Sequence, residues 1–145
     1  MGIAYEKDII AWANEQASFI RAGRFDLLDI EHLAEEIEDV GKSEQRELEN
    51  RMAVLLAHLL KWQFQPTHRG RSWLATIREQ RKMIAIRLKQ TPSLKKSLSD
   101  NDWKEAAWVS ASSQAIQETS LDESVFPEFC TWTTEQILDQ EFFPE

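Results

Sequence analysis

The stretch that decides the fold runs from Ser43 to Pro66 and reads SEQRELENRMAVLLAHLLKWQFQP. Its apolar residues recur every three or four positions, which is the period of an α-helix. Ser43 fits an N-cap, and Pro66 predicts the end of the helix because proline cannot continue one. The apolar face is the widest in the sequence, so we expect this helix to be the centre of the core. The face consists of Leu48, Met52, Leu55, Leu56, Leu59, Leu60 and Gln63.

Two shorter helices are expected before this central one. Apolar residues recur at helical spacing from Tyr5 to Ile20, and Gly23 fits the position after a helix C-cap, where glycine is common. A second apolar pattern covers residues 30–37. Gly41 predicts the end of that helix, since glycine weakens a helix interior. The sequence therefore predicts a break at Gly41, just before the central helix begins.

Four further helical segments are expected after Pro66. Each begins with a residue type that caps helices or is favoured in their first turn. We also expect Trp62, Trp73 and Trp103 to pack against the central helix or near its end. The predicted starts are Ser72, the pair Thr91-Pro92, Asp100 or Asn101, and the capping box Thr133–Gln136.

The whole chain is predicted to form a single all-α domain over residues 1–145. Only four glycines and four prolines are present, which is too few for the many tight turns of an all-β protein. We expect a bundle of about five main helices plus a short C-terminal helix. Two extended segments, Phe126-Pro127 and Phe143-Pro144, are expected to wrap around its surface.

Cysteine content and hydropathy limit the environment of the protein. Cys130 is the only cysteine, so no disulfide forms within the chain, and we expect the residue to be buried as a small apolar group. The N-terminus has no apolar stretch typical of a signal peptide. The longest apolar run, residues 53–60, is far too short to span a bilayer. These features predict a cytoplasmic protein without a membrane partner.

The charges are sorted along the chain into three blocks. Residues 1–50 carry 5 Lys and Arg against 13 Asp and Glu, residues 51–100 carry 11 against 2, and residues 101–145 carry 1 against 10. A basic middle block of this kind either is neutralised by acidic elements of the same assembly or binds an anionic partner. The net charge of −8 argues against a nucleic-acid-binding domain, which is typically basic.

Several multi-residue motifs follow one another in a recognisable order. They are Glu35–Glu38, Gly41–Glu44, His58–Pro66, Arg71–Trp73, Thr76–Arg81 and Pro92–Leu94. In these motifs the sequence resembles the bacterial family catalogued as domain of unknown function 29, and the resemblance covers nearly the whole chain. It implies a small all-helical protein. It implies no activity and no site residues, because the family has none established.

One candidate active site uses the rim of the central helix. Glu47, Arg51 and His58 lie on one stripe, at steps of four and seven residues. Together with Glu36 from the preceding helix, His58 and Glu47 have the side chains of general acid–base chemistry. The alternative is that His58 packs at the edge of the core with one ring nitrogen bonded to a carbonyl or carboxylate. We favour this structural role for a lone histidine on an apolar helix.

A candidate metal site is formed by Asp29, His32 and Glu36, whose spacing of three and four residues places them on one side of a helix. The alternative is an exposed acidic face. The chain has no Glu-x-x-His pair of the kind that helical bundles use to bind metals. We therefore favour the acidic face and expect no metal or other cofactor.

The basic segment 69–96 is a candidate anion-binding site, because arginine forks bind phosphates and Trp73 can stack on a base. The alternative, which we favour, is that the segment pairs with acidic residues of the same bundle or of another subunit. A Glu36–Arg81 or a Glu44–Arg78 pair would serve this purpose. The arginines assigned to the candidate anion site are Arg69, Arg71, Arg78 and Arg81.

No catalytic triad and no glycine-rich phosphate loop is recognisable in the sequence. We therefore expect a non-enzymatic module whose charged faces select a protein partner, including a second copy of the chain. Two alternatives remain. One is an enzyme with a site around His58, Glu36 and Glu47, and the other is an anion- or nucleic-acid-binding protein that uses segment 69–96.

Overall fold

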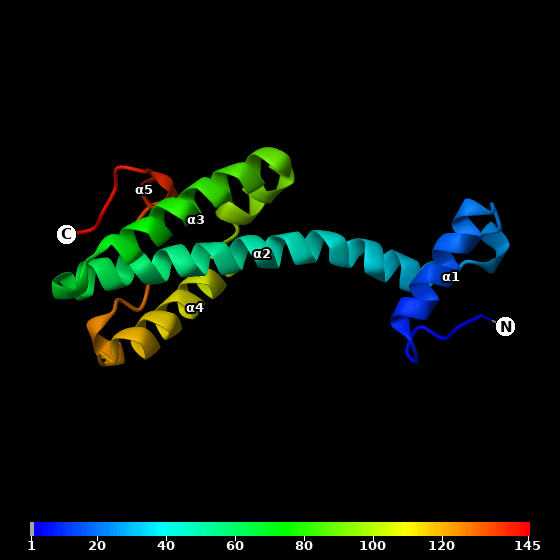
Figure 1. Cartoon of the computed structure of the whole chain (residues 1–145), viewed down its shortest axis with the longest axis horizontal. Helices are drawn as coiled ribbons and strands as arrows, with labels where there is room; N and C mark the ends of the chain where they lie inside the picture. The colour runs from blue at the N-terminus through cyan, green and yellow to red at the C-terminus, as the bar shows by residue number, and fades with distance from the viewer. Residues whose placement is uncertain (1) are drawn as a thin grey trace. The chain divides into compact units, whose positions relative to one another are not determined.

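The computed structural model describes residues 2–145, and this part of the chain contains helices and no β-strand. The predicted all-α class is therefore confirmed, and Figure 1 shows the course of the chain. Within the same residues, no helix is both long enough and apolar enough to cross a membrane. The elements are α1 (Ile9–Arg21), α2 (Ile30–Phe64), α3 (Arg71–Gln90), a 3-10 helix (Pro92–Ser99), α4 (Asn101–Thr119) and α5 (Thr134–Leu138).

The predicted break at Gly41 is wrong. Helix α2 continues through Gly41 and Ser43 as one helix of 35 residues, so the predicted N-cap at Ser43 is wrong as well. Glycine weakens a helix by about 1 kcal/mol relative to alanine but does not exclude it, so good helix formers on both sides override it. No packing neighbour lies within 4 Å of the place where a Cβ of Gly41 would be. The glycine is therefore tolerated there without a packing role.

The other predicted helix ends agree with the structure except at two starts. Asp100 caps α4, Thr133 begins α5 with the predicted capping box, and Gly23 follows α1 with a φ of 73°. One exception is α1, which begins at Ile9 and not at Tyr5. The other is Ser72, because the N-cap of α3 is Gly70, two residues earlier, and the helix begins at Arg71.

The chain divides into two compact units. The N-terminal unit ends at Ser43 and contains α1 and the first turns of α2. Its buried residues are Trp12 and Gln16 of α1. Trp12 Nε1 donates to the carboxylate of Asp29 at 3.0 Å, and the Asp29 backbone N–H donates to the side-chain oxygen of Gln16 at 2.7 Å. Polar contacts therefore hold the start of α2 against α1.

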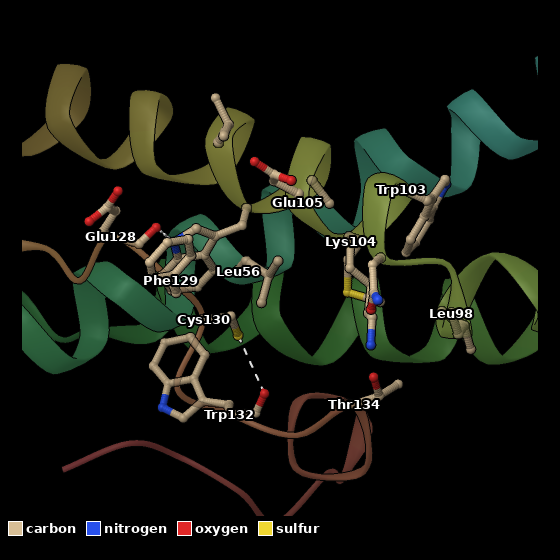
Figure 2. Close-up of a pocket in the computed structure, with 15 residues that line it drawn as sticks. Leu56, Leu98, Trp103, Lys104, Glu105, Glu128, Phe129, Cys130, Trp132 and Thr134 are labelled. Atoms are coloured by element: carbon tan, nitrogen blue, oxygen red, sulfur yellow. Dashed lines mark hydrogen bonds between the residues drawn. The ribbon is translucent and has the colours of Figure 1, made fainter.

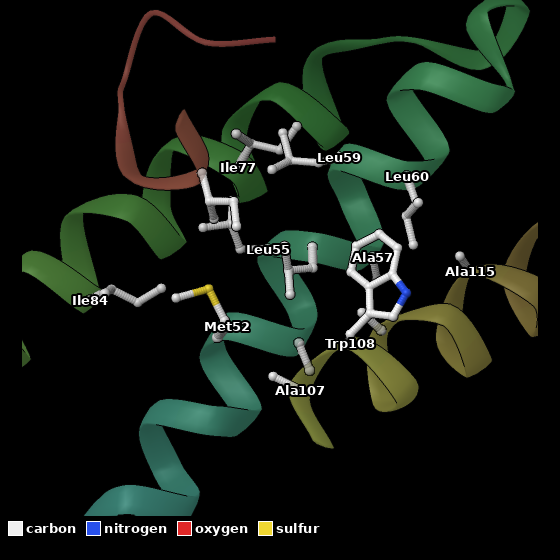
Figure 3. Close-up of a cluster of buried hydrophobic side chains, with 14 of the residues drawn as sticks. Met52, Leu55, Ala57, Leu59, Leu60, Ile77, Ile84, Ala107, Trp108 and Ala115 are labelled. Atoms are coloured by element: carbon white, nitrogen blue, oxygen red, sulfur yellow. The ribbon is translucent and has the colours of Figure 1, made fainter. Parts of the chain in front are cut away.

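In the C-terminal unit, Glu44–Glu145, the rest of α2 is the central helix, as its wide apolar face predicts. Figure 3 shows α3 on one side of α2 and α4 on the other. On α4 the buried face contains three alanines, Ala107, Ala111 and Ala115, whose small side chains allow close approach of the two helices. Each large buried side chain stabilises the fold by roughly 1.5–3 kcal/mol. The largest of them are Leu48, Leu55, Leu59, Leu60, Ile77 and Ile84.

The chain after α4 wraps onto this core, as predicted for the Phe-Pro segments. Phe126 is buried and packs edge-on against Phe64, with ring centroids 5.5 Å apart. Phe143 packs against Trp62 at 5.1 Å. Two aromatic pairs therefore anchor the C-terminal segment to the end of α2.

The tryptophans also lie where the sequence predicts. Trp103 Nε1 donates to the backbone carbonyl of Gln45 on α2 at 3.1 Å. The ammonium group of Lys61 lies 5.1 Å from the centre of the Trp73 ring, a cation–π contact. Both residues thus attach neighbouring helices to α2.

Candidate functional site

Two residues of the candidate active site, Glu47 and His58, are not brought together. Glu47 and His58 both lie on α2, eleven residues apart, which separates them by about 16 Å along the helix axis. Glu47 pairs with the guanidinium group of Arg87. Glu36 belongs to the N-terminal unit, where it accepts a hydrogen bond from the hydroxyl of Tyr5. Each carboxylate of the set therefore has a structural partner of its own.

His58 has contacts that fit a structural role. Its Nδ1 lies 2.8 Å from the backbone carbonyl oxygen of Val54, one turn earlier in α2. Nδ1 carries the proton, because a carbonyl oxygen can only accept. Burial lowers the pKa of His58 from its usual 6.5, so the neutral ring is favoured.

Two of the three candidate metal ligands, Asp29 and His32, are bound to each other, and all three contact aromatic residues. His32 Nδ1 lies 2.7 Å from an oxygen of Asp29, and the His32 ring stacks on Tyr5 at 4.1 Å. The Asp29 oxygen also accepts the Trp12 hydrogen bond, and Glu36 accepts from Tyr5. Among residues 2–145, no group of three or more His, Cys, Asp and Glu side chains is arranged to hold a metal ion.

Hydrogen bonding in this network shifts three pKa values. The bond from His32 lowers the pKa of Asp29, and Asp29 raises the pKa of His32 above 6.5. The bond to Glu36 raises the pKa of Tyr5 to about 12. These shifts favour a charged His32–Asp29 pair and a neutral tyrosine.

Two of the four arginines assigned to anion binding hold the C-terminal unit together. Arg81 is 2% exposed, and its Nε and Nη2 donate to the backbone carbonyls of Ile137 and Phe142 at 2.8 and 2.7 Å. Arg69 donates to the carbonyl of Trp62 at 2.6 Å. Arg81 thereby attaches the segment around α5 to α3.

Neither of the two predicted ion pairs is found. Arg87, and not Arg78, pairs with Glu44 at 3.5 Å. Arg81 binds carbonyl oxygens in place of Glu36. The basic segment is therefore neutralised in part only, through one of its arginines.

The other two arginines, Arg71 and Arg78, belong to a row of exposed cations on α3 that we did not predict as a unit. Lys82 and Lys89 continue the row, and the spacings of seven, four and seven residues keep all four within about 40° around the helix axis. In the described part of the chain, no carboxylate oxygen lies within 4.0 Å of these four groups. We call these four residues the basic stripe.

A cavity of about 480 Å³ lies in the C-terminal unit between α4 and the segment Glu128–Thr134 (Figure 2). This volume falls within the range of small-molecule sites. Cys130 lines it and is exposed, so its predicted burial is wrong; its Sγ lies 3.4 Å from the carbonyl oxygen of Trp132. Desolvation raises the pKa of the Cys130 thiol. The apolar and aromatic walls include Met52, Leu56, Trp103, Trp108, Phe129 and Trp132.

The N-terminal unit exposes a set of large aliphatic side chains. On α2, the exposed residues Ile30, Ile37 and Val40 and the partly buried Leu33 follow one another at spacings of three, four and three residues, as on a coiled-coil face. The exposed fractions of the set lie between 47% and 74%. The set, which we call the apolar stripe, consists of Ile9, Ile10 and Ile20 on α1 and Ile30, Ile37 and Val40 on α2.

Sequence comparison agrees with the motifs and with the helical fold. A family model described as "Domain of unknown function DUF29" matches residues 4–143 of the 145-residue chain. The chain belongs to this family. No match was found among curated proteins or among solved structures. The description of the DUF29 family contains no activity. The apolar stripe, the basic stripe and the cavity are the surface features of this chain that bear on its function.

Proposed function

We propose that this DUF29 protein is a protein–protein interaction module and that its N-terminal unit docks onto the partner. The observation that carries the proposal is the apolar stripe, with six aliphatic side chains between 47% and 74% exposed. Grouped exposed apolar side chains with polar residues around them are typical of interaction sites. The docking surface is therefore the stripe on α1 and the first turns of α2.

Burial of the apolar stripe supplies the free energy for binding. Full burial of one valine or isoleucine is worth about 1.5–3 kcal/mol, and association costs roughly 4–15 kcal/mol in lost freedom of motion. Six side chains on two helices are enough to exceed the lower part of that cost. The coiled-coil spacing on α2 favours a helix as the bound element of the partner.

An enzymatic function has less support from the positions of the candidate residues. His58 and Glu47 are far apart on one helix, and the Asp29–His32 pair is in contact with Tyr5 and Trp12. General acid–base catalysis needs both groups within hydrogen-bond reach of the same substrate. The interaction role does not require such convergence.

Two matched valine substitutions test the proposal. Val40 lies in the apolar stripe at 66% exposure, and Val109 lies on α4 at 58% exposure. The partner is isolated with tagged wild-type protein and purified, and the dissociation constant is then measured. Val40→Glu is expected to weaken binding at least about tenfold, or about 1.4 kcal/mol. Val109→Glu is expected to leave the dissociation constant unchanged.

Two outcomes contradict this proposal, provided circular dichroism shows the wild-type helix content in both variants. One is a Val40→Glu variant that binds as tightly as the wild type. The other is a loss of binding in Val109→Glu alone, which would place the docking surface at the cavity wall, to which Val109 belongs.

A further inference from the structure

The basic stripe has no carboxylate partner within 4.0 Å in the C-terminal unit, Glu44–Glu145. All four of its residues, from Arg71 to Lys89, are exposed. Glu79 is the one acidic residue of α3, and it lies about 80° around the axis from Arg71. Four cations on one face of a helix repel one another unless anionic groups face them. The stripe is therefore suited to a binding partner with a complementary row of negative charge.

The N-terminal unit carries such a row. Residues 2–43 contain 10 Asp and Glu against 4 Lys and Arg. Glu31, Glu35 and Glu38 are exposed on α2 and lie within about 60° around its axis. Within residues 2–145, none of the three has a cationic group within 4.0 Å. We call these three residues the acidic stripe.

We propose that the partner of this surface is a second copy of the chain, with the acidic stripe of each copy bound to the basic stripe of the other. The inference rests on the proposed function, because it uses the N-terminal unit as the docking element. The two stripes match in spacing. Glu31 and Glu38 are seven residues apart, as are Lys82 and Lys89, so two helices lying side by side bring both pairs into contact at once.

The surroundings of the basic stripe also allow another helix to pack there. Ala75 and Ala85 lie beside the cations of α3, and their small exposed side chains allow another helix to approach closely. Ile86 lies on the same side of α3 and is 45% exposed. On α2 the apolar stripe lies about 140° around the axis from the acidic stripe, so the ionic contact uses the side of the helix away from Ile37 and Val40.

A second copy fits these surfaces better than a nucleic acid does. The chain carries a net charge of −8, which repels a polyanion at long range. Each copy carries one acidic and one basic stripe, so a reciprocal pair neutralises all four stripes and leaves none to recruit a third copy. Reciprocal contact therefore predicts a closed dimer.

Sedimentation velocity of the full chain tests the dimer. At about 0.1 M NaCl, where the Debye length is about 10 Å, we expect the wild type to sediment as a dimer. Raising the salt to about 1 M shortens that length to about 3 Å and is expected to weaken the dimer at least about tenfold. Arg78→Glu/Lys82→Glu is expected to be a monomer at low salt. Lys95→Glu/Lys96→Glu makes the same change of charge on the adjacent 3-10 helix and is expected to remain a dimer.

A charge exchange makes the test specific for these two stripes. Glu35→Lys/Glu38→Lys is also expected to be a monomer, because both of its stripes are then basic. Mixed with Arg78→Glu/Lys82→Glu, it is expected to form a heterodimer, since the two lysines introduced in one variant can face the two glutamates introduced in the other, and the remaining acidic and basic stripes are unchanged. Each variant should keep the wild-type helix content in circular dichroism, because every substituted residue is exposed.

Three results overturn the inference: a monomeric wild type at low salt, a dimer that survives both charge reversals, or variants that do not associate when mixed. A monomeric wild type that binds a single-stranded RNA through Arg78 and Lys82, with steep salt dependence, assigns the basic stripe to nucleic acid instead. The proposed function is judged separately. If the chain is a monomer but Val40→Glu still abolishes binding of an isolated protein partner, the proposed interaction function is supported and the proposed self-association is rejected.

Discussion

The interactions that stabilise the C-terminal unit internally differ from those that stabilise the N-terminal unit. In the C-terminal unit, apolar side chains of α2, α3, α4 and the C-terminal segment form one buried cluster. In the described residues of the N-terminal unit, Trp12 and Gln16 are buried and the main cross-contacts are the polar ones of Asp29 and Glu36. A unit that buries little apolar surface gains little from the hydrophobic effect. The difference indicates that the C-terminal unit carries the stability, whereas the N-terminal unit is suited to be covered by a partner.

The largest expected effect comes from two matched isoleucine substitutions, one in each unit. Ile84→Ala removes a fully buried side chain between α3 and α2, and is expected to lower the free energy of unfolding by about 2–5 kcal/mol. Ile37→Ala removes a side chain that is 71% exposed and should change it by less than about 0.5 kcal/mol. Urea unfolding followed by tryptophan fluorescence measures both. Equal losses would mean that the N-terminal unit has a core of its own.

A smaller effect is expected for the arginine that attaches the C-terminal segment. Arg81→Met keeps the apolar stem but leaves the carbonyls of Ile137 and Phe142 without donors, at a cost of about 1.5–3 kcal/mol. Amide hydrogen exchange should become faster in α5 and in the segment after it. Arg78→Met, three residues earlier on the exposed side of α3, is the control and should leave that exchange unchanged. Slow exchange of α5 in Arg81→Met would show that the aromatic pairs alone hold the segment.

A polar substitution in the N-terminal unit should have a smaller and more local effect. Trp12→Phe keeps an aromatic ring but removes the Nε1 donor to Asp29, and should cost about 1 kcal/mol in the local stability of α1. Hydrogen exchange in α1 should become faster while exchange in α3 and α4 stays as in the wild type. If the substitution also accelerated exchange in α3 and α4, the two units would unfold together and the contrast between them would be lost.

The smallest effect concerns the two histidines, which respond to pH in opposite directions. His32 has a raised pKa, so its contribution to stability is present below pH 6.5 and is lost as the pH rises through its folded-state pKa. His58 has a lowered pKa, so stability is lost as the pH falls from 6.5 through its folded-state pKa, because the unfolded chain then binds the additional proton. A titration followed by NMR should give a pKa above 6.5 for His32 and a pKa below 6.5 for His58. Asp29→Asn should lower the pKa of His32 towards 6.5 and leave the pKa of His58 unchanged.

Much of the fold could be predicted because its signals are local. The apolar face from Leu48 to Leu60 marks the central helix, and the caps at Asp100 and Thr133 mark the starts of α4 and α5. Such signals depend on neighbours three or four residues away, which the sequence displays directly. The break predicted at Gly41 failed because a single glycine costs less than the surrounding helix formers supply.

The candidate sites were predicted less well, because their outcome depends on residues distant in the sequence. Arg81 and Arg78 are three positions apart in one basic segment, yet one is buried against carbonyls of Ile137 and Phe142 and the other is exposed. Helical spacing alone shows which residues share a face of α3, but not which face is covered. The aromatic cavity beside Cys130 likewise joins α2, α4 and the C-terminal segment.

The sequence by itself determined the all-α class, the central helix, most of the helix ends and the membership in the DUF29 family. Period and capping are properties of short segments, and a family motif is a property of residue order. Only the tertiary structure decided which charges are paired, because Arg87 meets Glu44 and Lys61 meets Glu118 across more than forty positions of chain. Packing also buries the apolar face of α2 in the C-terminal unit, whereas the apolar stripe of the N-terminal unit is exposed.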